Sequence, residues 1–128
     1  MKKIIFVFTC ILVASTALAQ EDSCLHFRTG KFSYMDDSSH RIIMKRTNHK
    51  QEERDEVSGT LTKFKVKWIS GCEYQLTQVW SNSRKKRKQN HAVINVLITR
   101  VYGKMYEFTC ACNSPGIEKK KGKVFMIN

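Results

Sequence analysis

The stretch that decides the fold is Leu61-Thr-Lys-Phe-Lys-Val-Lys-Trp68, in which Phe64, Val66 and Trp68 alternate with Lys63, Lys65 and Lys67. One apolar face and one polar, solvent-exposed face are typical of a half-buried strand, whereas a helix would spread the lysines around its circumference. Ser70-Gly71 supplies a turn, after which the alternation resumes, so the segment predicts a β-hairpin. Its apolar face carries Phe64, Val66, Trp68, Tyr74 and Leu76.

Strand-like patterns continue on both sides of the hairpin. Residues 24–34 alternate with a change of phase across Gly30, as a bulge or bend there would produce. Residues 92–101 are rich in β-branched side chains, which predicts a central strand covered on both faces. In the segment 51–57, residues 52–56 are all charged, which suits an edge strand or a loop. Shorter strands are expected at 41–46, 106–110 and 123–128.

These segments together predict an all-β fold. Seven or eight sequential strands joined by short turns, with no helix expected after residue 19, form an antiparallel meander. Rolled up, it gives a small lipocalin-like barrel or a sandwich. A chain of 128 residues holds one such domain and is too short for a large multidomain machine. The 41% of hydrophobic residues supply a core and exclude a disordered tail.

Residues 1–19 have the three parts of a secretory signal peptide. Lys2 and Lys3 precede an apolar run over residues 4–13, and Ala17-Leu-Ala19 is a small-x-small cleavage site. The run is shorter than the roughly 20 residues that span a bilayer, and no later segment of the sequence is long and apolar enough to do so. We therefore expect a single all-β domain over residues 20–128, exported to the periplasm or outside the cell.

Removal of the signal peptide would leave four cysteines, Cys24, Cys72, Cys110 and Cys112. An even count in an oxidising compartment predicts disulfides, with three possible pairings. A Cys24–Cys72 bridge would close a loop of about 50 residues and restrict the unfolded chain by about 4 kcal/mol. Two strand residues at i and i+2 bridge only if the strand is distorted. No histidine stands at a metal-site spacing from Cys110 and Cys112, so we expect them to be structural or free.

Three blocks carry a resemblance to a known group: CLHFRTGKF at 24–32, KWISGCEYQL at 67–76 and GKVFMI at 122–127. Together they resemble a group of small exported bacterial proteins without an established activity, some of which carry the name DNA topoisomerase IV. The Trp-x-x-x-Cys-Glu-Tyr block is the most specific part. The resemblance implies that Cys24 and Cys72 belong to a shared framework, which supports pairing them. Cys110-x-Cys112 and the basic residues 84–88 depart from the pattern.

The topoisomerase name conflicts with the physical demands of that reaction. Such an enzyme needs an ATP site, a metal-binding carboxylate cluster and a strand-breaking tyrosine within large gated domains. This short chain has no Gly-rich loop to cradle a phosphate, so topoisomerase activity is rejected.

Other catalytic chemistry has little support in the sequence. A ribonuclease-like hydrolase could use two histidines and a lysine, but the four histidines are scattered and no Gly-x-Ser-x-Gly or His-Glu-x-x-His motif is present. The carboxylates of the 51–57 segment suggest a solvated face rather than a metal site. We expect neither an enzyme nor a cofactor or metal. The histidines are His26, His40, His49 and His91, and the carboxylates are Glu52, Glu53, Asp55 and Glu56.

Charge points to anionic partners. The chain has 23 Lys+Arg against 11 Asp+Glu, a formal charge of +12. If folding joins its two basic clusters, they form a salt-sensitive surface for lipopolysaccharide phosphates, acidic polysaccharide or nucleic acid. Nucleic acid is the least favoured, because the aromatic residues fall mainly in core strand phases. The alternative is a solvated loop. The clusters are Arg84, Lys85, Lys86, Arg87 and Lys88, and Lys119, Lys120, Lys121 and Lys123.

The leading functional hypothesis concerns the barrel interior. Small barrels of about eight strands either fill with side chains or hold one small apolar ligand. Phe64, Val66, Trp68, Tyr74 and Leu76 would face such a ligand or pack as a core. The sequence therefore favours non-catalytic binding of a small apolar ligand or an envelope component. Polyanion binding by the basic clusters is the second hypothesis, and a ribonuclease-like hydrolase is the third.

Overall fold

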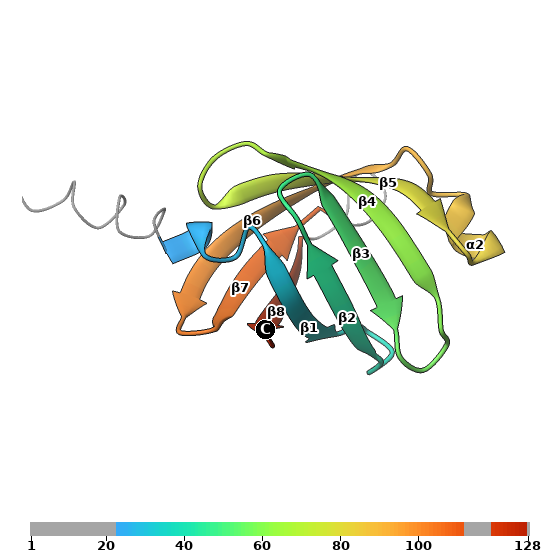
Figure 1. Ribbon diagram of the computed structural model, residues 1–128, viewed down its shortest axis with the longest axis horizontal. Coiled ribbons are helices and arrows are strands. Elements are labelled where there is room, and N and C mark those ends of the chain that lie inside the picture. The colour runs from blue at the N-terminus through green and yellow to red at the C-terminus, as the bar shows by residue number, and fades with distance from the viewer. Residues whose placement is uncertain (1–22, 112–118, 128) are drawn as a thin grey trace, which may run out of the picture.

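The computed structural model describes residues 23–111 and 119–127, which form a closed barrel of eight strands (Figure 1). The predicted signal peptide and Cys112 lie outside the described residues. The strands are β1 (Gly30–Met35), β2 (Arg41–Arg46), β3 (Lys50–Asp55), β4 (Leu61–Trp68), β5 (Glu73–Ser81), β6 (Val93–Tyr102), β7 (Met105–Cys110) and β8 (Lys120–Met126), and the short helix α2 (Arg84–Arg87) lies between β5 and β6.

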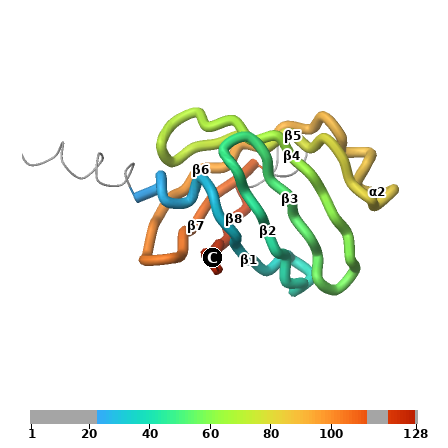
Figure 2. Tube along the Cα trace, in the orientation of Figure 1, coloured from blue at the N-terminus to red at the C-terminus, as the bar shows by residue number. Residues whose placement is uncertain are grey.

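The topology is an up-and-down meander, as the sequence predicted. Each strand pairs antiparallel with the next one along the chain (Figure 2). The barrel closes where β8 returns to β1, through the pairs Phe32–Met126 and Ser33–Phe125. Closure gives both outermost strands a partner, which removes the free sheet edges that an open meander would expose.

The predicted central hairpin is confirmed in β4 and β5. In β4, Phe64 and Val66 are buried while the three lysines between and beside them are exposed. Tyr74 and Leu76 are buried in β5. A shift of register between Lys63 and Phe64 interrupts the pairing. Because a bulge changes the phase of the alternation, Trp80 is exposed although it follows Tyr74 by an even number of residues.

The two ends of the barrel differ. At what we call the closed end, a disulfide joins Cys24, in the segment before β1, to Cys72, just before β5, with 5.2 Å between the Cα atoms. This confirms the pairing implied by the resemblance. At what we call the open end lie the turn after β1, helix α2 and the start of β8 (Figure 1). Cys110, at the end of β7, is buried and disulfide-bonded.

Three expectations about single segments were wrong. Residues 51–55 are not an edge strand, because β3 pairs with both β2 and β4, and only Glu56 and Val57 lie in the turn that follows. Strand β6 is not covered on both faces, since Val93 and Leu97 are 53% and 43% exposed. The residues around Cys24 form a helical turn rather than a strand, and α2 is a second helical segment. Side-chain alternation alone could not find these short turns.

Close packing between β7 and β8 fixes one aromatic wall of the interior. Phe108 is paired with Gly122, and its ring lies over that glycine. A Cβ atom added at Gly122 would stand 2.6 Å from the ring. Glycine is therefore required at this position for Phe108 to keep its orientation toward the interior.

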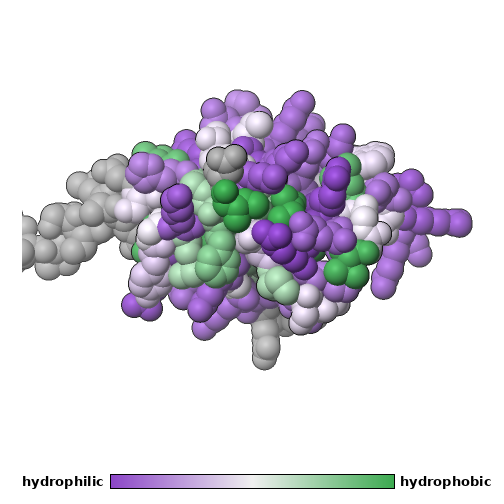
Figure 3. Space-filling model, turned by 60° about the horizontal axis from the view of Figure 1, so that its bottom comes forward, coloured by the Kyte–Doolittle hydropathy of each residue, from purple (hydrophilic) through white to green (hydrophobic). Residues whose placement is uncertain are grey.

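The face of the molecule in Figure 3 is mainly hydrophilic, with hydrophobic residues exposed among the polar ones. Tyr102, Met105 and Phe125 are neighbours across β6, β7 and β8, and exposed apolar side chains of this kind are common on folded domains. Among the described residues, no helix has both the length and the apolar character needed to cross a membrane.

Candidate functional site

A cavity of about 310 Å³ occupies the barrel interior and extends to the open end. Its deep walls come from strand residues that point inward, and its outer part is bordered by the turn after β1 and by α2. The volume lies at the lower limit of ordinary small-molecule sites. The apolar part of the lining includes Met35, Ile42, Met44, Phe64, Leu76, Ile94, Val96, Phe108 and Val124.

The lining also contains polar and charged side chains, among them the carboxyl group of Glu53. Glu53 of β3 accepts a hydrogen bond from the Tyr34 hydroxyl of β1. Burial raises the pKa of the Glu53 carboxyl, while the hydrogen bond from Tyr34 and the positive charges of Lys86 and Arg46 oppose that rise. Burial and the neighbouring Glu53 also raise the pKa of Tyr34. The pair gives the cavity one polar wall that can orient a ligand.

Helix α2 is attached to the cavity wall by a polar side chain. The Gln78 amide of β5 donates to the Lys86 carbonyl oxygen at 2.6 Å and to Asn90 Oδ1 at 3.0 Å. The Ser83 hydroxyl caps the helix by accepting from the Lys86 N–H. These bonds place Lys86 and Gln89 in the cavity lining, so α2 forms part of the open end.

A buried arginine fills the region beneath the cavity. Arg46 of β2 is 3% exposed and does not line the cavity. Its guanidinium donates to Gln51 Oε1 at 2.7 Å and to the Phe27 carbonyl oxygen at 2.8 Å. It also donates at 3.0 Å to the hydroxyls of Tyr74 and Tyr106. These bonds engage all three guanidinium nitrogens with protein acceptors, and Arg46 serves as a structural cation.

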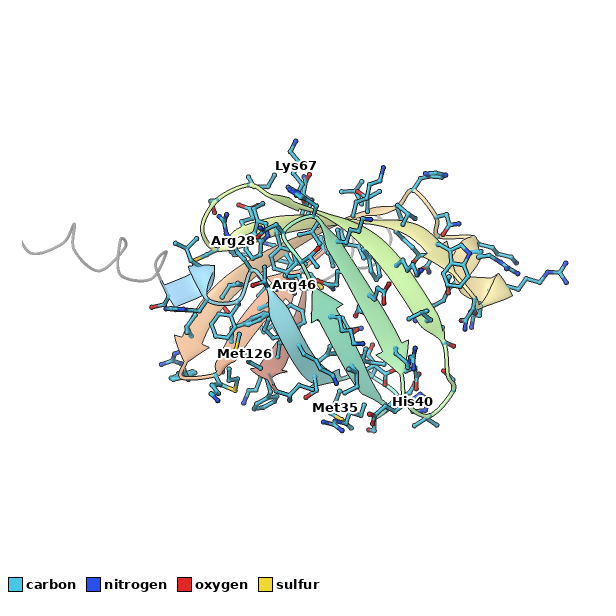
Figure 4. All side chains as sticks on the ribbon, in the orientation of Figure 1. Arg28, Met35, His40, Arg46, Lys67 and Met126 are labelled. Carbon is cyan, nitrogen blue, oxygen red and sulfur yellow. A yellow bond between two sulfur atoms is a disulfide. The ribbon has the colours of Figure 1, made fainter. Side chains whose placement is uncertain are left out.

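Aromatic rings surround the same guanidinium. Its central carbon lies 4.6 Å from the Tyr74 ring centroid and 5.0 Å from that of Phe32, distances typical of cation–π contacts. The Arg28 guanidinium lies 4.8 Å from the Trp68 ring centroid. Figure 4 shows Arg28 and Arg46 toward the closed end, away from Met35 and His40 at the open end. The closed end is thus filled by packed arginine and aromatic side chains.

The structure separates the five predicted ligand-facing residues. Phe64, Tyr74 and Leu76 line the cavity. Val66 lies in the buried core, and Trp68 packs against that core at the closed end. The alternation in the sequence gave their common inward direction, but it contained no information on their depth along the barrel.

The two predicted basic clusters lie at the same end of the barrel. Lys86, from the cluster at 84–88, and Lys120, Lys121 and Lys123, from the second cluster, all border the cavity. The ammonium group of Lys120 is paired with Asp37. The open end therefore carries charges of both signs rather than a purely basic surface.

The carboxylates of β3 do not form one solvated face, as the sequence suggested. Glu52 is exposed, but Asp55 is buried and Glu53 borders the cavity. The functional residues that sequence reasoning missed, Glu53 and Arg46, are polar residues that point into the barrel. The signal for Arg46 was its place in the same strand phase as Ile42 and Met44, the buried residues of β2. Glu53 gave no such signal, because Gln51 and Asp55, which share its phase on β3, are polar as well.

One group of possible metal ligands, Asp36, His40 and Asp55, lies near the open end. His40 Nδ1 is 2.8 Å from Asp55 Oδ2, and this bond raises the pKa of His40 and lowers that of Asp55. Asp36 Oδ1 accepts from two backbone N–H groups of its own turn, and Asp55 Oδ1 likewise accepts from the turn after β3. The carboxylates thus organise turns.

The fold and its cavity define the class of small, closed antiparallel meander barrels. Comparison with family models, curated proteins and solved structures found no match. The function is therefore argued from this chain's own residues, because architecture by itself does not assign one.

Proposed function

We propose that this protein is an exported, non-catalytic binding protein that holds a small, largely apolar ligand, or the apolar part of an envelope component, inside its barrel. The observation that carries the proposal is the cavity of about 310 Å³, whose lining exposes more apolar than polar surface. Small-molecule sites are typically apolar concavities with a few placed polar groups, and Tyr34 with Glu53 supplies such groups here. The disulfide supports an oxidising compartment.

The cavity limits the ligand's size and charge. At about 30 Å³ per water-sized unit of liquid, it takes a group of roughly ten non-hydrogen atoms. The charged residues of the cavity lining are four acids and four lysines, so charges of both signs border the site. They are Asp36, Asp37, Glu53 and Asp55, and Lys86, Lys120, Lys121 and Lys123. A ligand that is uncharged where it contacts the apolar walls suits this interior best, because burying an unpaired charge is costly.

Calorimetric titration with 1-octanol, a neutral ligand of about this size, tests the proposal. Ile94 lines the cavity, and Ile94→Phe would occupy ligand space. The adjacent Val93 is 53% exposed on the outside of the same strand, which makes Val93→Phe the matched control. We expect the unchanged protein and the control to bind alike, and Ile94→Phe to bind at least about tenfold more weakly.

Two results would overturn the proposal. One is an unchanged protein that takes up no octanol. The other is equal affinity in Ile94→Phe and Val93→Phe with both variants folded by circular dichroism, because binding would then lie outside the cavity.

A further inference from the structure

The outer face of β1–β4 carries a concentration of exposed lysines, which we call the lysine face. Alternation along each strand directs these side chains away from the barrel, as Figure 4 shows for Lys67. Among the outward-facing residues of these four strands, Glu52 is the sole acid. The lysine face consists of Lys31, Lys45, Lys50, Lys63, Lys65 and Lys67.

The sheet register places like charges directly opposite one another on this face. Lys31 pairs with Lys45 across β1 and β2, and Lys50 pairs with Lys65 across β3 and β4. Directly opposed like charges destabilise a sheet. Lys45 also faces Glu52 across β2 and β3, but the Glu52 carboxylate lies 3.8 Å from the Lys63 ammonium, and none of the four opposed lysines forms an ion pair with a described residue. The arrangement lowers stability and concentrates positive charge, which an anionic partner would offset.

An aromatic side chain ends the row of charges that crosses the strands. The register aligns Lys31, Lys45, Glu52, Lys63 and Trp80 from β1 to β5, with about 5 Å between neighbouring strands. The Lys63 ammonium lies 5.3 Å from the Trp80 ring centroid, yet Trp80 is still 41% exposed. The bulge in the β4–β5 pairing turns this ring outward, so an aromatic platform lies beside the basic row.

We infer that the lysine face is a binding site for single-stranded nucleic acid, with phosphates on the lysines and a base stacked on Trp80. Positive tracks bordered by stacking aromatics are the usual means of binding single strands without sequence preference. An acidic polysaccharide would use the lysines but gain nothing from base stacking. The site is separate from the cavity and from the two basic clusters at the open end.

Fluorescence anisotropy of a labelled 15-nucleotide oligothymidylate, measured over a series of salt concentrations with the purified exported protein, tests the inference. Lys45→Gln/Lys65→Gln removes one member of each opposed pair. Each phosphate contact on a single strand contributes about 0.7 to the slope of log affinity against log salt. We expect the double variant to bind more weakly, with a slope shallower by about 1.4.

The matched control is Lys85→Gln/Lys88→Gln, which removes the same charge at helix α2. We expect it to keep most of the oligonucleotide affinity. Urea denaturation gives a second readout. Lys65→Gln relieves the repulsion from Lys50, whereas Lys45→Gln relieves the repulsion from Lys31 but also removes a charge opposite Glu52, so we expect the double variant to keep about the stability of the unchanged protein. Equal loss of binding in both double variants would contradict the site, since net charge alone would then explain it.

Trp80→Ala separates nucleic acid from other polyanions, with heparin as the polyanion that lacks bases. We expect about a tenfold loss of oligonucleotide affinity and unchanged heparin affinity. Absence of oligonucleotide binding by the unchanged protein would overturn the inference, and so would unchanged oligonucleotide affinity in Trp80→Ala. In the latter case the lysine face would bind polyanions without reading bases.

Discussion

Replacing the buried arginine by methionine, Arg46→Met, is expected to destabilise the barrel strongly. The side chain of methionine follows part of the arginine stem but offers no donor. The Phe27 carbonyl and the Gln51 amide oxygen would lose partners now at 2.8 and 2.7 Å. Hydrogen bonds to charged groups contribute about 1.5–3 kcal/mol each. The Tyr74 and Tyr106 hydroxyls, 3.2 Å apart, would still bond to each other, so we expect a loss of about 3–5 kcal/mol.

Urea denaturation measures this loss. With a typical slope of about 2 kcal/mol per molar urea, the midpoint should fall by about 2 M. Lys45→Met, at the adjacent exposed position of β2, is the control and should change the unfolding free energy by no more than about 0.5 kcal/mol. Coincident midpoints for Arg46→Met and Lys45→Met would refute the view that the guanidinium network holds the closed end together.

Three further predictions concern the disulfide and two titrating groups. Cys24→Ser should lower the unfolding free energy by about 2–4 kcal/mol because the unfolded chain loses its restraint at Cys72; an unchanged urea midpoint would contradict this. Burial raises the pKa of Glu53 above its usual 4.5, so unfolding releases its proton and stability falls as pH rises above about 4.5. Glu53→Gln should remove that dependence, and parallel urea-midpoint profiles of the two proteins would speak against it. The hydrogen bond that the His40 imidazole donates to the Asp55 carboxylate raises the pKa of His40 above 6.5. The stabilisation from His40 is therefore complete below pH 6.5 and is lost as pH rises through the higher folded pKa. The stabilisation from Asp55 is lost as pH falls through its lowered pKa. An NMR titration should show the His40 pKa lower in Asp55→Asn than in the unchanged protein, whereas an equal value would exclude the pairing.

Sequence predicted the fold where one strand face was clearly apolar. The alternation of Leu61–Trp68 gave the central hairpin, because burial of one face has the same period as the strand itself. The same reasoning failed on β3, whose inward residues Gln51, Glu53 and Asp55 are polar. Inside a barrel that has a cavity, an inward position can be polar, so polarity no longer indicates solvent.

The positions of the residues in the cavity, at the closed end and on the lysine face could not be predicted from local sequence pattern, because they follow from the assembled barrel. Arg46 reads as one more surface cation until the register places it beside Gln51 and beneath the rings of the core. Trp80 has the sequence phase of the buried residues of β5, and only the bulge reveals that it is exposed. The depth of a residue along the barrel, which separates Phe64 from Trp68, likewise follows from the assembled structure.

The most direct test of the central claim is a native mass spectrum of the protein purified under mild conditions from the cells that make it, compared with that of Ile94→Phe. We expect a discrete additional mass on the unchanged protein that disappears on denaturation and is absent from the variant in which the cavity is filled. An unchanged protein that carries no additional mass after mild isolation, or the same additional mass on both proteins, would contradict the account of the barrel interior as a ligand site.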